Sequence, residues 1–451
     1  MCLLAFPVTL TESRGCSIIG LADGKPASIF TKEGRDMKKE YYSGNRKNVI
    51  REMKNGSLAV FFSGDEIRRS ADENYDFFGN RNFLYLTGIE EPGLVLLLGK
   101  DSAGAGWEKL YLRRPDAFAE RWTGKRTKES EAAEKAAAEA FDYAENFEKD
   151  FHGLAVSGNY AFLYADTYKE STEDIDTRAH RFVRDVKDAW PYLQIENGTM
   201  ILRKLRTIKQ PCEIEAIRKA EAITKEGILA MMKISRPGLY EYQYKAEFEH
   251  ALWQHGTEGT GFPPIISAGA NNFCIHYYAY QGQAQDGDMI LNDVGARWNG
   301  LVNDVSRGWP CNGKFTERQK LLYNCALATS DHMFQIIRPG MKMAEVDAEI
   351  RRYNYEQLKD AGVCEKWEDI GTYMWHGGAH HIGYDVHDMV KTPEIIAPGM
   401  AFCVDVGIYH EEWGIGFRVE DNCLVTEDGC ENLSKDIPRT IADIEDCMRN
   451  I

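Results

Sequence analysis

Residues 289–310 form the stretch MILNDVGARWNGLVNDVSRGWP, in which two apolar runs lie on either side of an Asn-Gly pair. This pattern predicts a β-hairpin. Asp293 lies on the first arm, and Asp304 follows eleven positions later on the second. Any even-length loop puts both carboxylates on one face of the hairpin, ~5–8 Å apart at Cβ, where they repel each other. A cation must neutralise them, and either a bound metal ion or a plain salt bridge to Arg307 would do so.

A second stretch, WHGGAHHIGYDVHD at residues 375–388, concentrates histidine in a glycine-rich segment. Four of the eleven histidines of the chain lie within twelve residues there, namely His376, His380, His381 and His387. A histidine that only packs in a core does not require other histidines close to it in the sequence. Imidazole binds Mn, Fe, Co or Zn far better than Mg or Ca. The spacing is not the HExxH of zincin helices. Some of these rings would instead donate hydrogen bonds to a substrate or to a developing oxyanion.

Two apolar runs near the end of the chain each carry an acidic residue, which is costly inside a strand unless it is paired or bound to metal. GMAFCVDVGIY carries Asp405, and GFRVEDNCLVT carries Glu420. Arg418 shares a face with Glu420, so a salt bridge to arginine remains an alternative for either acid taken alone. The complete set of candidate ligands is Asp293, Asp304, His380, Asp405 and Glu420. Four carboxylates and one imidazole suit two metal ions ~3.5–4 Å apart that share bridging carboxylates.

The amino-acid composition excludes several functional classes. The 451 residues carry 54 basic and 70 acidic side chains, a net charge of −16. Such a surface repels phosphate backbones and anionic lipid, so we expect no nucleic-acid partner and no membrane partner. The sequence contains no run of 18 apolar residues. The eleven cysteines form no CxxC pair, which favours reduced thiols and a cytoplasmic location.

Strand-like runs alternate with helix-forming segments, which predicts an α/β protein of the α+β type. The strands expected in its first part are residues 57–64, 82–89, 93–99, 109–115 and 159–166. Residues 128–151 are rich in helix formers, and Pro211 marks the start of a long amphipathic helix. We place a first domain at residues 37–180, a linker at residues 181–200 and a larger second domain at residues 201–451.

Residues 1–36 differ from the rest of the chain because they show no sustained period. Two interpretations remain open. They are an extension that precedes a biological start at Met37, or they are a genuine N-terminal arm. Their apolar beginning, MCLLAF, has no basic region and is soon interrupted by polar residues, so we do not expect a signal peptide.

The order of the candidate ligands resembles that of the metallopeptidase family with the pita-bread fold, which includes methionine aminopeptidase, prolidase and aminopeptidase P. The shared pattern is an Asp, a second Asp eleven positions later, HGxxHxxGxxVHD, an acid in GMxxxVxxGxY and Glu in RxED. Residues 202–224 resemble the helix that opens the family's catalytic domain, and residues 63–93 resemble the N-terminal domain of bacterial aminopeptidase P. The resemblance covers roughly residues 45–440. It implies an N-terminal α/β domain followed by a larger pita-bread catalytic domain.

The resemblance also implies a role for each candidate residue. The five candidate ligands would bind two divalent ions, with Asp304 and Glu420 bridging them. His276 would lie near the substrate and the leaving amine, whereas His376 and His387 would contact the substrate around the scissile bond. Arg418 would hold a ligand carboxylate from behind, as such partners usually do. His381 stands where bacterial aminopeptidase P often has tryptophan, so we expect it to be non-essential.

One position departs from the family pattern. The family usually has Glu followed by Pro where this chain has Asp405 and Val406. That glutamate is a ligand and the proposed acceptor of the proton of the attacking water. Aspartate offers the same carboxylate on a stem that is shorter by one methylene. Binding of the second metal ion is weakened unless the strand lies closer to the site.

The resemblance implies an Xaa-Pro aminopeptidase, which releases the N-terminal residue of a peptide with proline second through a metal-bridged hydroxide. Manganese is the metal that it suggests, and the ligand set would also accept cobalt, zinc or iron. The family's two-domain members imply a homodimer or homotetramer. Three alternatives remain: a prolidase that cuts only dipeptides, a metal-free creatinase-like hydrolase, and a metal-poor non-catalytic homologue in which Asp405 fails as a ligand.

Overall fold

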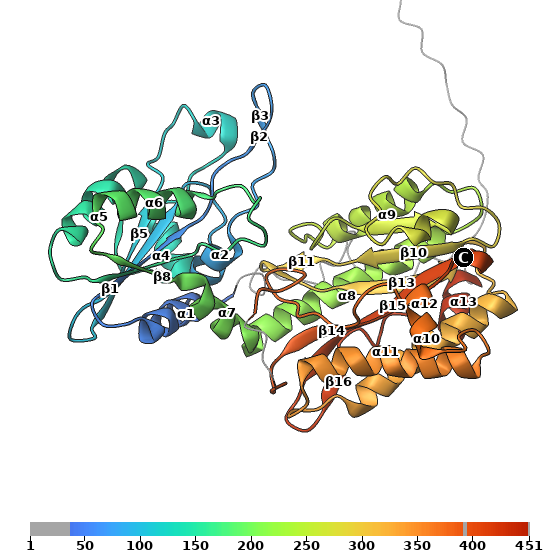
Figure 1. Cartoon of the computed structure of the whole chain (residues 1–451). Coiled ribbons are helices and arrows are strands. Elements are labelled where there is room, and N and C mark those ends of the chain that lie inside the picture. Colours follow the sequence, from blue (N-terminus) through green and yellow to red (C-terminus); the bar gives the residue numbers. More distant parts are fainter. Residues whose placement is uncertain (1–36, 391–394, 450–451) are drawn as a thin grey trace, which may run out of the picture. The chain divides into compact units, whose positions relative to one another are not determined.

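The computed structural model describes residues 37–390 and 395–449. Our expectation for residues 1–36 lies outside this part of the chain. The described residues contain a six-stranded sheet followed by two smaller sheets with helices packed against them (Figure 1).

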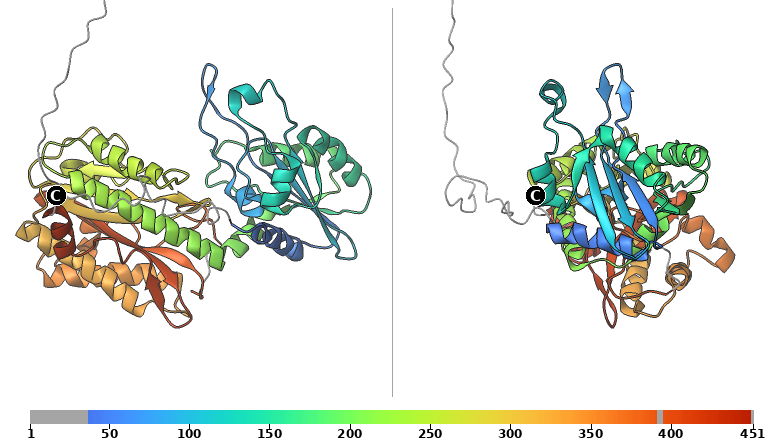
Figure 2. Two further views of the ribbon diagram at one scale, coloured as in Figure 1. Left: turned by 180° about the vertical axis from the view of Figure 1, so that it is seen from behind. Right: turned by 90° about the vertical axis from the view of Figure 1, so that its left-hand side faces the viewer.

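The first part of the chain is organised around the six-stranded sheet, whose order is β6-β5-β4-β1-β7-β8. Its strands are β1 (Ser57–Phe62), β4 (Val95–Lys100), β5 (Gly106–Leu112), β6 (Phe141–Tyr143), β7 (Phe162–Ala165) and β8 (Gln194–Asn197). The central strand β1 runs antiparallel to β4 and parallel to β7, and all six of its residues are buried. Helices accompany the sheet, as the two views in Figure 2 show; the longer ones are α1 (Lys39–Glu52), α4 (Glu129–Ala136), α5 (Phe147–Ala155) and α6 (Arg178–Ala189).

Residues 82–89 were expected to form a strand, and this expectation is wrong. The structure has the helix α2 at Arg81–Thr87. The side chain of Asn80 caps it by accepting a hydrogen bond from the Phe83 N–H, and Gly88 ends it at a φ of 69°. All seven helical residues are buried, the polar Arg81, Asn82 and Thr87 among them, so no exposed polar face alternates with an apolar one to give the sequence a helical period.

Two further expectations for this part need correction. Residues 181–200 are not a linker, because they contain the end of α6 and the strand β8, which pairs with β7 in the six-stranded sheet. The helix expected at residues 128–151 is divided into α4 and α5 by the short strand β6. Both errors arise because short strands of only three or four residues carry little pattern of their own.

The second part of the chain contains the sheets β13-β10-β9 and β14-β15-β16. Their strands are β9 (Ile265–Ala268), β10 (Met289–Val294), β13 (Val305–Pro310), β14 (Ala401–His410), β15 (Ile415–Val425) and β16 (Cys430–Asn432). The main helices are α7 (Gly198–Thr207), α8 (Pro211–Ile234), α9 (Glu241–Gln254), α10 (Glu317–Ile336), α11 (Met343–Asp360) and α13 (Ile441–Arg449). The helices α10 and α11 pack against β14, whereas α9 packs against β9 (Figure 1). The helix α8 begins at Pro211, as the sequence predicts.

The predicted hairpin is confirmed. Strands β10 and β13 are antiparallel, and the short strands β11 (Arg297–Trp298) and β12 (Leu301–Val302) continue the hairpin to its tip. Asn299 and Gly300 form the turn with φ values of 52° and 77°, as a type I′ turn requires. The register pairs Asp293 with Ser306, so Asp304 occupies the diagonal position on the same face as Asp293.

A buried ion pair joins the two smaller sheets. Arg307 on β13 is fully buried and donates to Asp421 Oδ1 on β15 at 2.7 Å and to the Glu420 carbonyl at 2.7 Å. Because Arg307 pairs with Asn292 in the register, it lies on the opposite face from Asp293. The salt-bridge alternative for the two hairpin aspartates is therefore wrong: the partner of Arg307 is Asp421.

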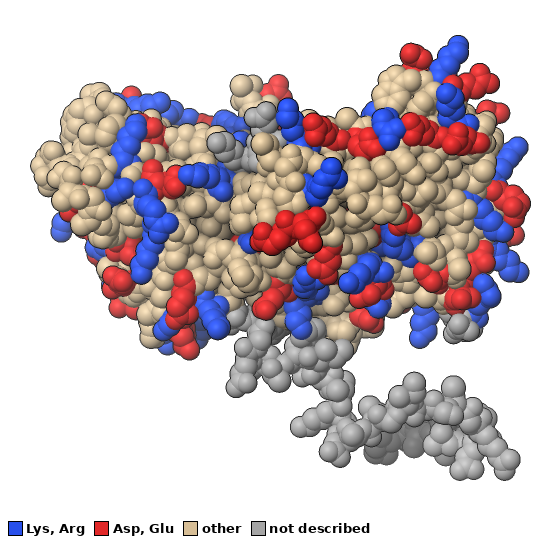
Figure 3. Space-filling model, turned by 90° about the horizontal axis from the view of Figure 1, so that it is seen from below, with Lys and Arg blue, Asp and Glu red and all other residues tan. Residues whose placement is uncertain are grey.

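Charged side chains of both signs are interspersed on the face drawn in Figure 3. No helix within the described residues has both the length and the apolar composition needed to cross a bilayer.

We expect Asp421→Ala to lower the free energy of unfolding by ~3–5 kcal/mol, because Arg307 would keep its buried charge without an oppositely charged partner. Urea denaturation measures the change. Glu431→Ala is the matched control, since the pair that Glu431 forms with Arg218 is partly exposed on both sides and should contribute less than ~1 kcal/mol. Equal effects of the two substitutions would contradict this account of the sheet contact.

Candidate metal centre

Five chain segments bring the predicted ligands together. Asp293 lies on β10, and Asp304 directly precedes β13. Asp405 on β14 is paired in register with Glu420 on β15. The histidine-rich segment lies along β14, because Cys403 N–H donates to the His380 carbonyl and Asp405 N–H donates to the Gly378 carbonyl, both at 2.8 Å.

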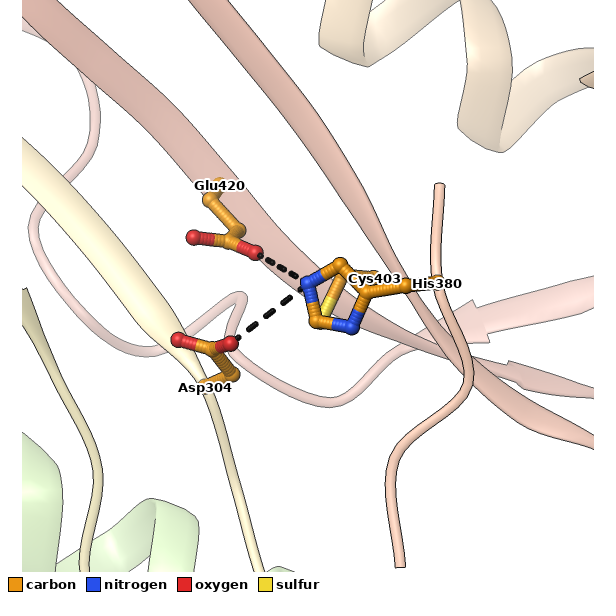
Figure 4. A group of neighbouring side chains, drawn as sticks. All are labelled: Asp304, His380, Cys403 and Glu420. Atoms are coloured by element: carbon orange, nitrogen blue, oxygen red, sulfur yellow. Dashed lines mark ion pairs between the residues drawn. The ribbon is translucent and has the colours of Figure 1, made fainter. Parts of the chain in front are cut away.

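Four side chains form the tightest group. Ligand atoms of Asp304, His380, Cys403 and Glu420 all lie within 4.8 Å of one another. The Nε2 atom of His380 is 3.4 Å from Glu420 Oε1 and 3.6 Å from Asp304 Oδ2 (Figure 4). Sequence reasoning predicted three of the four and missed Cys403. The sequence feature that could have identified Cys403 is its position two residues before Asp405, because this spacing puts both side chains on one face of a strand.

Asp293 and Asp405 flank this group. Asp293 Oδ2 accepts a hydrogen bond from Arg418 Nη2 at 2.8 Å, and Asp405 Oδ2 is 3.2 Å from His376 Nδ1. Neither Asp293 nor Asp405 is among the residues whose ligand atoms lie within 4.8 Å of one another.

Each of the five predicted ligands keeps one buried polar atom for which the described part of the chain offers no hydrogen-bond partner. These atoms are Asp293 Oδ1, Asp304 Oδ1, His380 Nδ1, Asp405 Oδ1 and Glu420 Oε1. Burying an unpaired polar atom costs ~1–3 kcal/mol, and more if the group is charged. Oxygen and imidazole nitrogen are donors that divalent transition metals accept, so these residues fit a metal centre.

The electrostatics of the cluster lead to the same conclusion. Burial, followed by the neighbouring charge of Glu420, raises the pKa values of Asp304 and Asp405 well above their usual range. Burial also acts to raise the pKa of Glu420, but the nearby His380 ring and the hydrogen bond from Ser306 lower it to about 2. Burial raises the pKa of Asp293 although Arg418 opposes the change. Four carboxylates packed this closely cannot all ionise unless cations lie among them.

The other predicted histidines lie around the cluster. The rings of His387 and His380 are 4.1 Å apart between centroids, and His387 lines a cavity of about 820 Å³. His376 Nε2 lies 3.0 Å from the Tyr409 hydroxyl. Burial lowers the pKa values of His376 and His387 to about 4. His276 is exposed and contributes, after burial and His380, to the low pKa of His387.

Arg418 and His381 differ in their relation to the cluster. Arg418 is buried and bridges Asp293 and the Tyr409 hydroxyl, to which it donates at 2.9 Å. His381 is also buried, but its ring packs against Phe402 and is not part of the four-residue group.

A second ion-pair network fixes the segment that carries His387. Lys209 Nζ donates to Asp388 Oδ2 at 2.7 Å, and Arg206 pairs with both Asp388 and Asp385. Burial acts to raise the pKa of Asp388, but Arg206 and Lys209 lower it to about 2. The carboxylate therefore stays charged and anchors the neighbouring His387.

Comparisons with known proteins place the chain in a family. The family described as Metallopeptidase family M24 matches residues 215–427, and the one described as Aminopeptidase P, N-terminal domain, matches residues 42–163. The Xaa-Pro aminopeptidase of Escherichia coli K12 is 29% identical over 440 residues, which cover 92% of this chain and 98% of that protein. The Xaa-Pro aminopeptidase of Haemophilus influenzae is 30% identical over 433 residues, which cover 91% and 97%.

Solved structures agree with these matches. A Bacillus anthracis protein solved as a candidate aminopeptidase P superposes with a TM-score of 0.89 at 33% identity, covering 92% of this chain and 99% of that one. Escherichia coli aminopeptidase P with the inhibitor Pro-Leu superposes with a TM-score of 0.84 at 28% identity and the same coverage. The expected order of an N-terminal α/β domain and a pita-bread catalytic domain is confirmed. The chain belongs to the aminopeptidase P family of M24 pita-bread metallopeptidases.

Proposed function

We propose that the protein is an Xaa-Pro aminopeptidase that removes the N-terminal residue from peptides with proline in second position. The observation that carries the proposal is the convergence of four carboxylates and His380 inside the M24-matched residues 215–427. Each carboxylate keeps one buried oxygen without a hydrogen-bond partner among the described residues, and His380 Nε2 lies 3.4 Å from Glu420 and 3.6 Å from Asp304. The proline preference is taken from the Xaa-Pro aminopeptidases of Escherichia coli and Haemophilus influenzae and from the Pro-Leu inhibitor bound by the Escherichia coli enzyme.

Asp293, Asp304, His380, Asp405 and Glu420 would hold two divalent ions, and Asp304 and Glu420 are the residues to which the family resemblance gives a role at both. Manganese is the metal implied by the sequence resemblance, and cobalt, zinc and iron suit the same donors. Two such ions, when bound, lower the pKa of a shared water and polarise the scissile carbonyl.

The residues of this chain supply the remaining steps. Asp405 would accept the proton of the attacking water at Oδ1, the oxygen that has no partner among the described residues. His387 faces the cavity and would donate a hydrogen bond to the oxyanion that develops on the carbonyl. His376 would support the same substrate region, and the exposed His276 would assist the leaving amine. Arg418 would hold Asp293 in place through their 2.8 Å contact.

The cavity beside His387 has room for a peptide longer than a dipeptide, and His387 is the predicted site residue that lines it. Its volume of about 820 Å³ lies in the upper part of the ~300–1,000 Å³ range of ligand pockets. It is lined by the 384–390 segment and by side chains from earlier in the chain, including Phe78, Tyr168 and Arg203. A prolidase restricted to dipeptides would need a site closed to this volume.

We further propose that the protein acts in the cytoplasm as a homodimer or homotetramer. The cytoplasmic location is supported by the cysteines, since the nine within the described residues are all free thiols. The oligomer is supported by the family resemblance.

Chelator-treated protein that is reloaded with Mn²⁺ should hydrolyse peptides of three or more residues that have proline second. Liquid chromatography of the released amino acid measures turnover. Replacing that proline by alanine should lower kcat/KM by at least ~10-fold, because the subsite for the second residue would lose its contacts with the proline ring. Hydrolysis of Xaa-Pro dipeptides alone would indicate a prolidase, and hydrolysis that ignores proline would overturn the proposed specificity.

A comparison of His380→Ala with His381→Ala should distinguish a metal ligand from an adjacent histidine that does not bind the metal. Added Mn²⁺ should raise the Tm of the chelator-treated wild type, since an ion that binds only the folded state at ~100 times its Kd stabilises it by ~2.7 kcal/mol. We expect His380→Ala to lose most of this rise and His381→Ala to keep it, as followed by differential scanning fluorimetry. A full metal-induced rise in His380→Ala would remove His380 from the ligand set.

Asp405→Ala should lower kcat by ~10²–10⁴-fold, because it removes both a ligand and the proton acceptor. Asp405→Glu should act in the opposite direction. The added methylene extends the carboxylate by ~1.5 Å toward the cluster that Asp405 does not join, and metal bonds tolerate errors of only ~0.2 Å. We therefore expect tighter binding of the second ion in a calorimetric titration. Wild-type metal content and turnover in Asp405→Ala would exclude a catalytic role.

A further inference from the structure

The thiol of Cys403 occupies a position that the metallopeptidase resemblance does not use. Cys403 lies on β14 and is fully buried. It is paired in register with Asn422, whose side-chain amide donates to Cys403 Sγ at 3.3 Å. Because strand side chains alternate, Cys403 projects on the same face as Asp405. The sulfur therefore faces the cluster from the strand that supplies one of its carboxylates.

The four side chains in Figure 4 offer one nitrogen, one sulfur and two carboxylate oxygens within 4.8 Å of one another. Bonds of ~2.0–2.3 Å at tetrahedral angles separate ligand atoms by ~3.3–3.8 Å. The distances from His380 Nε2 to Glu420 Oε1 and to Asp304 Oδ2, 3.4 and 3.6 Å, already have this size. A movement of ~1 Å closes the remaining separations around one ion.

Two independent features mark this group as a ligand site. Asp304 Oδ1 and Glu420 Oε1 are buried polar atoms that lack a hydrogen-bond partner among the described residues. In addition, Asp405 Oδ2 lies 3.2 Å from His376 Nδ1, and Asp405 lies outside the four-residue group. Cys403 therefore supplies the fourth ligand atom of this group, a place that neither Asp293 nor Asp405 takes.

We propose that Cys403 is a metal ligand, and that its sulfur makes the position formed with Asp304, His380 and Glu420 selective for zinc, cobalt or iron over manganese. The inference rests on the metal centre of the proposed function. The thiol releases its proton to solvent as the sulfur–metal bond forms, and no oxidation is involved. Thiolate is a soft donor that favours these metals, whereas manganese prefers a set made only of oxygen and nitrogen.

X-ray absorption at the zinc edge tests the bond in the wild-type chain. Protein that has been chelated and then reloaded with one equivalent of Zn²⁺ should show a sulfur shell at ~2.3 Å beside nitrogen and oxygen at ~2.0–2.2 Å. Reloading with Co²⁺ should produce a thiolate-to-cobalt charge-transfer band in the near ultraviolet. Cys403→Ser should lose both signals and should weaken Zn²⁺ binding at least ~10-fold more than Mn²⁺ binding.

Cys423→Ser is the matched control. Cys423 is equally buried on the neighbouring strand, but it is paired with Phe402 and so lies on the opposite face of the sheet from Cys403. This variant should keep the sulfur shell and the charge-transfer band. A wild type with only nitrogen and oxygen around zinc, or a Cys403→Ser variant that retains the band, would overturn the proposal.

These readouts are independent of the proposed activity. A sulfur shell in a protein that does not cleave Xaa-Pro peptides would support the ligand assignment and reject the substrate. Cleavage of Xaa-Pro peptides by a protein without the shell would do the reverse.

Discussion

The pairing register of β14 with β15 is the constraint on which the site depends. It sets Asp405 opposite Glu420 and Cys403 opposite Asn422, so that acid, thiol and amide share one face. The opposite face places Asp421 against Arg307 of β13 and joins the two sheets. A slip of one residue would exchange these faces, burying the ligands in the sheet contact and removing the ion pair from it. Fold and centre are therefore specified by the same hydrogen-bond ladder.

The close packing of buried carboxylates makes the candidate metal centre electrostatically unfavourable, and interactions elsewhere in the fold offset this cost. The carboxylates of Asp304 and Asp405 are held where burial and Glu420 raise their pKa values, a state that only nearby cations relieve. Two buried charges elsewhere are instead paired directly, Arg307 with Asp421 and Lys209 with Asp388.

Sequence patterns predicted the elements that carry the site better than those that surround it. The hairpin, the two late strands and the start of α8 have strong local signals, namely an Asn-Gly turn, long apolar runs and a proline at the first helical position. The helix α2 has no such signal, because it is buried on every side, and β8 is too short to show a period. Cys403 was missed because a lone cysteine in an apolar strand has the appearance of core, and only the folded sheet places it beside His380.

We propose that five side chains from five segments hold two divalent ions. An anomalous difference map from crystals grown with the metal would test it most directly. The account predicts two peaks ~3.5–4 Å apart, with Asp304 and Glu420 contacting both. A map with no peak between Asp304 and Glu420, under conditions in which the protein hydrolyses peptide, would contradict it.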